Sequence, residues 1–289
     1  MTDDPFARHR SLLFTVAYEM LGSAADAEDV VQETWLRWSG VDQTEILDPR
    51  AYLVRIVTRQ ALNRLRSVAR RREDYVGEWL PEPLLTSPDV AADVELAENV
   101  SIAMLTVLET LGPAERAVFV LREVFDTPYD EIAEAVDKSP AAVRQIAHRA
   151  KEHVAARRPR MAVSTTEQQQ AVDRFLAAVR GGDLQGLLDV LAPDVVVVAD
   201  GGGVKAAARR PISGAERVAT WLLKGLETVA IEPTAIWING APAIRLDVDG
   251  QLDTAVSLAV EGGRITHVYA IRNPDKLGRF DDVADLTRA

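Results

Sequence analysis

Hydrophobic residues in the first 72 positions recur at intervals of three and four, the period of helices that bury one face. The first helix is marked by Leu12, Leu13, Val16, Ala17 and Met20. Gly22 is placed to end this helix, and Ser23 is placed to cap the next. Asp48-Pro49 then begins a third helix, expected over about residues 50–72. The pattern predicts an all-helical module over residues 1–72.

A second helical module is predicted over residues 102–160, with breaks near Gly112-Pro113 and Thr127-Pro128. Residues 127–154 have the form of two short helices around a tight turn. In the second of these helices the positions predicted to face the core are Val143, Ile146, Ala147, Ala150 and Val154. Between the modules, residues 73–101 contain three prolines and eight acids but no Lys or Arg, which is typical of a linker.

Beyond residue 160 the pattern changes to one of helices followed by strands. Residues 161–170 are polar and indicate a second linker, and residues 171–191 predict two helices separated by Gly181-Gly182. Strand-like runs follow at 195–199, 235–238, 243–248, 255–260 and 265–271. An antiparallel meander after helices is typical of an α+β domain. The predicted fold class is therefore multidomain, with two all-α modules followed by an α+β domain over residues 161–289.

Composition narrows the classes of function. The 289 residues include no cysteine, which excludes disulfides, thiolate zinc sites and a cysteine nucleophile. Neither a long apolar run nor the apolar core of a signal peptide is present, so no membrane-spanning helix or signal peptide is expected. The lack of cysteine favours a cytoplasmic location, and no metal or cofactor is expected. The net charge of −11 argues against nucleic-acid binding only superficially. The excess acid lies in the linker and the C-terminal third, which leaves room for basic stripes in the helical modules.

The helix predicted over residues 26–38 has an acidic face. At about 100° per residue, Glu28, Asp29, Gln32 and Glu33 share one side. The opposite, apolar side consists of Ala27, Val30, Val31, Thr34 and Trp38. The apolar side must pack within its own module, so the acidic side is free to meet a basic partner helix. The alternative is a solvated acidic face without a partner.

Two further helices carry basic stripes. In the third helix the stripe consists of Arg55, Arg59, Asn63, Arg66 and Arg70, which can follow a phosphate backbone and contact bases. In the helix of residues 139–151, capped by Ser139, the outward residues are Arg144, Gln145, His148, Arg149 and Lys151. Arg pairs with guanine and Gln with adenine in the major groove, as in a recognition helix. The alternatives are an arginine-rich solvent face and an ordinary helical hairpin.

Together these segments resemble extracytoplasmic-function (ECF) sigma factors of RNA polymerase. DAEDVVQETWLRW is similar to region 2.2, DPRAYLVRIVTRQALNRLR to regions 2.3–2.4, and LGPAERAVFVLREVFDTPYDEIAEAVDKSPAAVRQIAHRA to region 4. The resemblance implies a core-polymerase contact made by Asp26, Glu28, Asp29, Gln32, Glu33 and Trp35. It also implies that the Arg55–Arg70 stripe holds the opened −10 strand of promoter DNA, that loop 39–49 captures a flipped base, and that residues 139–151 read the −35 duplex. Arg59 and the SPAAVRQ start of the recognition helix depart from the family pattern. These departures affect which promoter sequence the protein would recognise.

The remainder resembles the SigJ-type sigma factors, which carry a fused SnoaL-like, NTF2-like cone. The three signatures are WLPEP (residues 79–83), DGGGVK (200–205, with Val204 as a departure) and NPDKL (273–277). The regulatory contacts that this implies involve Trp79, Leu80, Glu82, Asp200, Gly201, Gly202, Gly203, Lys205, Asn273, Pro274, Asp275, Lys276 and Leu277. Lys205, Arg209, Arg210 and Lys276 are expected to meet Glu78 and Glu82. The fused domain would replace a separate anti-sigma factor.

Other functions remain open from the residues alone. NTF2-like relatives include enzymes, so Asp200, His267, Asp275 and Lys205 are candidates for acid–base groups beside a cavity lined by Trp221 and Trp237. Such a cavity would also suit an unidentified small ligand. Two whole-protein alternatives are a one-component helix-turn-helix regulator with a ligand-sensing domain and a SnoaL-like enzyme with a nucleic-acid-binding N-terminus. The acidic helix favours the sigma factor, because neither alternative needs it.

Overall fold

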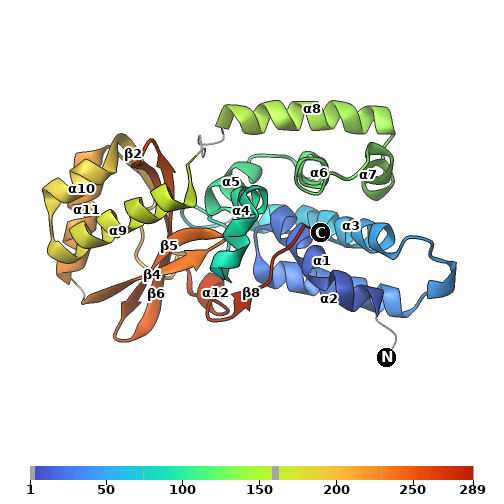
Figure 1. Cartoon of the computed structure of the whole chain (residues 1–289), viewed down its shortest axis with the longest axis horizontal. Coiled ribbons are helices and arrows are strands. Elements are labelled where there is room, and N and C mark those ends of the chain that lie inside the picture. Colours follow the sequence, from blue (N-terminus) through green and yellow to red (C-terminus); the bar gives the residue numbers. More distant parts are fainter. Residues whose placement is uncertain (1–3, 74, 158–162, 229, 289) are drawn as a thin grey trace. The chain divides into compact units, whose positions relative to one another are not determined.

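The chain folds into two compact units that interleave along the sequence (Figure 1). The computed structural model describes residues 4–73, 75–157, 163–228 and 230–288, and for residues 68–73 and 226–228 it describes the backbone only. Unit 1 comprises Met1–Glu73, Leu105–Arg157 and Asp285–Ala289, whereas unit 2 comprises Asp74–Met104 and Arg158–Ala284. Each unit has its own core.

The first part of unit 1 is a bundle of three helices, α1 (Pro5–Leu21), α2 (Ala24–Ser39) and α3 (Pro49–Glu73). Gly22 ends α1 in the left-handed conformation, and the Ser23 hydroxyl accepts a hydrogen bond from the amide of Asp26. A short 3₁₀ turn, η1 (Gln43–Glu45), interrupts the loop before α3. The predicted apolar side of α2 is buried, including Trp38 at 1% exposure. The predicted phases of these helices are therefore confirmed.

The second part of unit 1 contains the helix-turn-helix. It consists of α6 (Pro113–Phe119), a π-helical turn η3 (Val120–Val124), α7 (Tyr129–Val136) and α8 (Pro140–Arg157). Asp137 adopts a left-handed conformation (φ 56°) and makes the turn between α7 and α8. The five apolar residues predicted to face the core from α8 are all buried. The basic side of α8 therefore faces outward.

The last residues of the chain also belong to unit 1. The Ser11 hydroxyl donates to the carboxylate of Asp285 (2.6 Å), and the amide of Thr287 donates to the hydroxyl of Thr15 (3.1 Å). Leu286 between them is buried. The tail is therefore anchored on α1.

Unit 2 is built on one eight-stranded sheet in the order β3-β2-β7-β6-β5-β4-β1-β8. The strands of the C-terminal part are β2 (Leu191–Asp200), β3 (Ile212–Ser213), β4 (Ile231–Ile238), β5 (Ala241–Val248), β6 (Gln251–Glu261), β7 (Arg264–Ile271) and β8 (Val283–Ala284). Strands β4 to β7 form the predicted antiparallel meander, but β2 pairs with β7 in parallel. The helices are α9 (Thr165–Gly181), α10 (Leu184–Val190), α11 (Ala215–Thr228) and the short α12 (Pro274–Leu277).

Both faces of this sheet are covered. Helices α9, α10 and α11 pack on one face, where Val256, Leu258 and Val260 of β6 contribute to the core. The alternate residues of β6, Ala255 and Ala259, join a second core on the opposite face. Because both sides of β6 are buried, its sequence is a nearly continuous apolar run, without the alternation expected of a half-exposed strand.

The second core is completed by the stretch that precedes residue 105. Residues 75–104 form β1 (Leu85–Thr86), a 3₁₀ helix η2 (Pro88–Ala92), α4 (Val94–Val100) and the start of α5 (Ile102–Leu108). Leu80 and Ile102 are fully buried against the sheet, together with Ile238, Ile271 and Phe280. The stretch that the sequence predicts as a linker is therefore an ordered part of unit 2.

Helix α9 begins earlier than predicted. The Ser164 hydroxyl accepts from the amide of Glu167, and the Glu167 carboxylate accepts from the amide of Ser164. This reciprocal capping box satisfies two amides at the helix start, so the polar residues 165–170 are helical.

Candidate nucleic-acid interface

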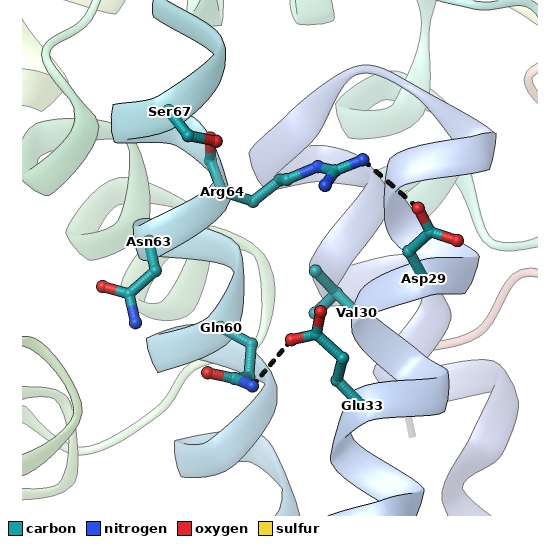
Figure 2. Close-up of a pocket in the computed structure, with 7 residues that line it drawn as sticks. All are labelled: Asp29, Val30, Glu33, Gln60, Asn63, Arg64 and Ser67. Carbon is teal, nitrogen blue, oxygen red and sulfur yellow. Dashed lines mark hydrogen bonds and ion pairs between the residues drawn. The ribbon is translucent and has the colours of Figure 1, made fainter.

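The acidic side of α2 is bound from within the module by side chains of α3 (Figure 2). The Arg64 guanidinium donates to Asp26 (2.5 and 2.8 Å) and to Asp29 (3.2 Å), and the amide of Gln60 donates to Glu33 (2.8 Å). The hydrogen bond that Arg64 donates to Asp26 raises the pKa of Arg64 above its usual range. These contacts line a polar groove between α2 and α3 and fix the direction in which the acids point.

The rest of the predicted partner-binding side of α2 faces solvent. Gln32 is exposed, and Glu28 pairs with Arg10 of α1 (2.7 Å). Trp35 and Leu36 are 45% and 57% exposed, which is unusual for large apolar side chains on a helix that has a buried side. Acids beside exposed apolar side chains form a surface suited to a basic helical partner.

The arginine stripe of α3 is partly engaged by α7. The Arg55 guanidinium pairs with the Glu134 carboxylate (2.7 Å), and Arg59 donates to the Glu134 backbone carbonyl (2.7 Å). Asn63 and Arg66 are exposed. Arg70 lies in α3, but its side chain is outside the described residues. Two of the predicted DNA-binding arginines are therefore held by a helix of the other helical module.

A groove lies beside this contact. Its walls come from loop 41–48, the start of α3 and the acidic side of α7, and they include Ile46, Tyr52, Arg55, Glu131 and Glu134. Leu47 on the loop is fully exposed. The 3₁₀ turn is held by Asp42, whose carboxylate accepts from the hydroxyl and the amide of Thr44. These two hydrogen bonds lower the pKa of Asp42. The loop predicted to capture a flipped base therefore opens onto a groove that α7 closes on one side.

Helix α8 presents its predicted recognition residues to solvent. Ser139 caps the helix by accepting from the amide of Ala142 (3.2 Å). Arg144, Gln145, His148, Arg149 and Lys151 are all exposed. Lys151 pairs with Glu123 (2.7 Å), and His148 lies 3.4 Å from Glu152. The side chains therefore form an outward row of hydrogen-bond donors on a rigid helix.

The three SigJ-type signatures, one in the linker and two in the C-terminal part, meet around Asp200. This fully buried carboxylate accepts from the Lys276 ammonium (2.6 Å), the Tyr75 hydroxyl (2.6 Å) and the amides of Leu80 (2.9 Å) and Gly202 (3.0 Å). Lys276 also donates to the Leu80 carbonyl (2.5 Å) and lies 4.0 Å from the centre of the Trp79 ring. Asp200 and Lys276 thus bind both backbone polar groups of Leu80. We call this arrangement the linker clamp.

The glycines of the DGGGVK signature allow the close packing of the linker clamp. A Cβ at Gly201 would collide with the carbonyl oxygen of Lys205, and one at Gly202 would lie 2.5 Å from Asn273. Asn273 in turn donates to the Tyr75 hydroxyl (2.8 Å) and accepts from the amide of Asp275 (3.1 Å). Burial, and then the hydrogen bond to Asp200, raise the pKa of Tyr75. The phenol therefore stays protonated as a donor.

The other predicted regulatory residues lie around the linker clamp in different roles. Lys205 pairs with Asp253 (3.1 Å), which Arg272 also binds (2.8 Å). Glu82 is buried, Leu277 packs against the second core, and Pro274 and Asp275 are exposed. Lys276 binds Asp200, and the contact of Lys276 with Glu78 or Glu82 stays a prediction.

Two of the residues considered for acid–base chemistry, Asp200 and His267, lie apart. Asp200 is opposite Ile271 in the β2–β7 register, but His267 is opposite Val196, four residues or about 13 Å along the strands. His267 is stacked on Tyr269, with ring centres 5.8 Å apart, and burial lowers the pKa of His267. Trp221 is a residue of α11 and packs against the core beneath that helix. Among the described residues no cluster of His, Cys, Asp or Glu is placed to hold a metal ion.

Sequence reasoning missed two contacts of the linker. The Asn239 side chain accepts from the amide of Leu84 (2.9 Å) and donates to the carbonyl of Val100 (2.7 Å). Asn239-Gly240 forms the two-residue turn between β4 and β5, with φ values of 53° and 72°. An Asn-Gly pair between strand-like runs is a hairpin signal, but nothing in the pair indicates what its side chain would bind.

The helical modules and the fused sheet domain define a class of protein, a sigma factor of RNA polymerase. Residues 6–72 match the family model Sigma-70 region 2, and residues 101–154 match Sigma-70, region 4. The chain is 38% identical over 291 residues to "ECF RNA polymerase sigma factor SigJ" of Mycobacterium tuberculosis, covering 94% of this chain and 91% of the relative. It is 33% identical to "Probable ECF RNA polymerase sigma factor SigI" of the same species, covering 93% and 92% of the two chains.

A solved structure supports the same assignment. The crystal structure of the M. tuberculosis ECF sigma factor SigJ matches with a TM-score of 0.76 and 34% identity, over 94% of this chain and 97% of the other. The chain belongs to the ECF RNA polymerase sigma factors, and it is similar to SigJ over nearly its whole length, the fused sheet domain included. Its function is promoter recognition at transcription initiation. No described helix is both long and apolar enough to cross a membrane.

Proposed function

We propose that this sigma factor binds the core polymerase through the acidic side of α2, with Asp26, Asp29 and Glu33 facing a basic helix. In the same proposal α3 holds the opened −10 strand and α8 reads the −35 duplex. Support comes from the exposed Trp35 and Leu36 beside the acids and from the outward row of donors on α8. Because its partner is the transcription machinery, the protein would act in the cytoplasm.

The fused domain would regulate this activity by holding the chain that joins the two DNA-binding modules. The observation that carries this part is the linker clamp, in which Asp200 and Lys276 bind both polar groups of the Leu80 backbone. A covalently attached domain acts at high effective concentration, so a separate anti-sigma factor is not needed. We infer no catalytic role, since Asp200 is occupied by four donors. A small ligand is not required.

Run-off transcription tests the proposal. The full-length protein and core polymerase are given templates selected by that holoenzyme, on which the −10 to −35 spacing varies in single base pairs. The wild-type protein should give promoter-dependent transcripts with a narrow spacing optimum. Lys276→Met should broaden this optimum, because it releases the linker. Exposed Lys224 on α11 provides a matched control, Lys224→Met, that loses the same charge.

The outcomes separate the two parts of the proposal. Absence of transcripts with the wild-type protein would overturn the polymerase and promoter contacts. A spacing profile unchanged by both Lys276→Met and Asp200→Asn would overturn the regulatory role alone. Point substitutions serve better than a fragment of residues 1–160, because that fragment would expose Leu80 and Ile102, which are fully buried in the whole protein.

A further inference from the structure

The ring of Tyr129 holds two arginines at the start of the helix-turn-helix. Tyr129 is the first residue of α7 and is half-buried. The guanidinium carbon of Arg122 lies 4.9 Å from the ring centre, and that of Arg144 on α8 lies 5.6 Å from it. Both distances are within the range of cation–π attraction. A single aromatic ring therefore links η3, α7 and the recognition helix.

Two cations can share this ring because one of them is already neutralised. Arg122 pairs with Asp126 (2.8 Å) and donates to the carbonyl of Thr127 (3.2 Å). These contacts fix Arg122 beneath the turn that begins α7. The repulsion between the two guanidinium groups is reduced, since the carboxylate of Asp126 balances one of them. Tyr129 is in turn confined between fixed neighbours.

Arg144 differs from Lys151 and His148 of α8 in how its side chain is held. Lys151 and His148 both lie beside carboxylates, those of Glu123 and Glu152, which compete with DNA phosphates for the same donors. The guanidinium of Arg144 instead lies over the ring of Tyr129. Among the described residues the N–H groups of Arg144 have no hydrogen-bond or ion-pair partner, so they are available. Those are the groups that pair in a bidentate manner with O6 and N7 of guanine in the major groove.

We propose that Tyr129 is a positioning residue that orients Arg144 for recognition of a guanine in the −35 element. This rests on the proposed role of α8 in DNA reading. Arg144 lies near the N-terminus of the helix, the part that contacts base edges in helix-turn-helix proteins. A long, exposed arginine loses rotamer freedom when it binds, and the ring removes part of that freedom beforehand. We expect the fixed orientation of Arg144 to increase the preference for one base, because a contact with a phosphate does not require the guanidinium plane to be fixed.

The test measures base preference position by position. Full-length protein with core polymerase is bound to promoters that carry each base in turn along the −35 element. The variants compared are Tyr129→Phe, Tyr129→Leu, Arg144→Ala and the double variant Tyr129→Leu/Arg144→Ala. We expect Arg144→Ala to abolish the preference for guanine at one position. Tyr129→Leu should reduce the same preference about two- to fivefold, whereas Tyr129→Phe retains it.

The double variant distinguishes positioning from a general structural role. In the Arg144→Ala background, Tyr129→Leu should cause no further loss of base preference. A loss that is equal at all positions, or equal with and without Arg144, would overturn the positioning role while leaving α8 as the DNA reader. If Arg144→Ala itself changes no base preference, the DNA contact of Arg144 fails and the role of Tyr129 fails with it. Thermal unfolding of each variant identifies any loss of folding.

Discussion

Asp200 is a carboxylate that folding removes from water entirely. Such a group is tolerated only when donors replace the lost solvent, and here a lysine, a phenol and two amides do so. Its position at the end of β2 makes it both a structural centre and the point where the linker is held. The side chain that was a candidate acid–base group is therefore used for internal binding.

Removing the lysine from this pair should destabilise unit 2 strongly. Lys276→Met leaves a buried charge without its counter-ion, which typically costs about 3–5 kcal/mol. The double variant Asp200→Asn/Lys276→Met should lower the free energy of unfolding by less than the sum of the two single changes, because neither buried charge is then left without its partner. Urea unfolding followed by tryptophan fluorescence measures this, since unit 2 contains Trp79, Trp221 and Trp237. Strict additivity would show that the two side chains do not act as a pair.

A second buried ionisable pair gives unit 1 a pH dependence. Glu19 of α1 is buried with both carboxylate oxygens unbonded among the described residues, and Arg116 of α6 donates to its backbone carbonyl (3.0 Å). Burial raises the pKa of Glu19 from 4.5 to about 8 and lowers that of Arg116 to about 9. The folded state therefore holds a proton on Glu19 that the unfolded state releases.

The sign of the effect follows from this proton. Between pH 4.5 and about 8 the folded state binds more protons than the unfolded state, so the free energy of unfolding of unit 1 should fall as the pH rises. The contribution of Glu19 protonation to the free energy of unfolding is complete below pH 4.5 and is lost by about pH 8. Glu19→Gln should remove most of this slope. Denaturation at about pH 5.5 and about pH 8 compares the two proteins, and parallel pH profiles would contradict the prediction.

At the scale of elements, α3 is packed on two sides. Its Leu53, Val57 and Ala61 are buried, and its neighbouring Val54 and Leu62 are buried as well. The arginine stripe emerges between these buried sides, where α7 places Glu134 against it. An acidic side chain in this position occupies the donors that a DNA phosphate would use. The helix predicted to bind the −10 strand is therefore partly occupied within unit 1.

Glu134→Gln should strengthen binding of single-stranded −10 DNA to the free protein. The ion pair with Arg55 is partly exposed, and such pairs contribute up to about 1 kcal/mol, so the expected gain is at most about fivefold. Fluorescence anisotropy with a labelled oligonucleotide measures it. Asp130→Asn on the same helix is the control, since Asp130 is exposed and carries the same charge. Equal increases in DNA affinity from Glu134→Gln and Asp130→Asn would mean that only the net charge of the protein determines the binding.

The helices with one buried side could be predicted from sequence in detail. The phases of α2 and α8 follow directly from apolar spacing, because their cores are formed by residues three and four apart. The capping box of Ser164 and Glu167 is also visible in the sequence, but the polar residues around it favoured a linker over the helix that forms. The fold of residues 75–104 could not be predicted. Its strand β1 has two residues, and its partners Asp200 and Asn239 lie 120 or more positions away.

At the scale of the whole molecule, each unit is assembled from separate stretches of chain. Unit 2 requires residues 75–104 to complete its sheet and second core, although they precede the helix-turn-helix. Leu80 and Ile102 are fully buried there, and burying each such side chain contributes about 1.5–3 kcal/mol. The C-terminal part, residues 161–289, therefore lacks an essential portion of its core when produced alone.

A complementation experiment tests this dependence. Residues 161–289 alone should unfold at lower urea concentration than unit 2 of the whole protein, and a peptide of residues 74–104 should restore part of the stability. A peptide with Leu80→Asp should not, because its charge would enter the second core. Isothermal titration calorimetry follows the binding. A fragment that is already fully stable, and that ignores the peptide, would contradict the prediction.

The interleaving of the two units has a consequence for how such a gene can change. The coding sequence enters unit 2 after residue 73, returns to unit 1 at residue 105, enters unit 2 again after residue 157, and ends in unit 1 with the tail anchored on α1. Any single recombination breakpoint between the first and last of these crossings divides at least one folded unit between two parents. The fused domain is thus poorly suited to exchange as a cassette, and its linker and tail are expected to be inherited together with it.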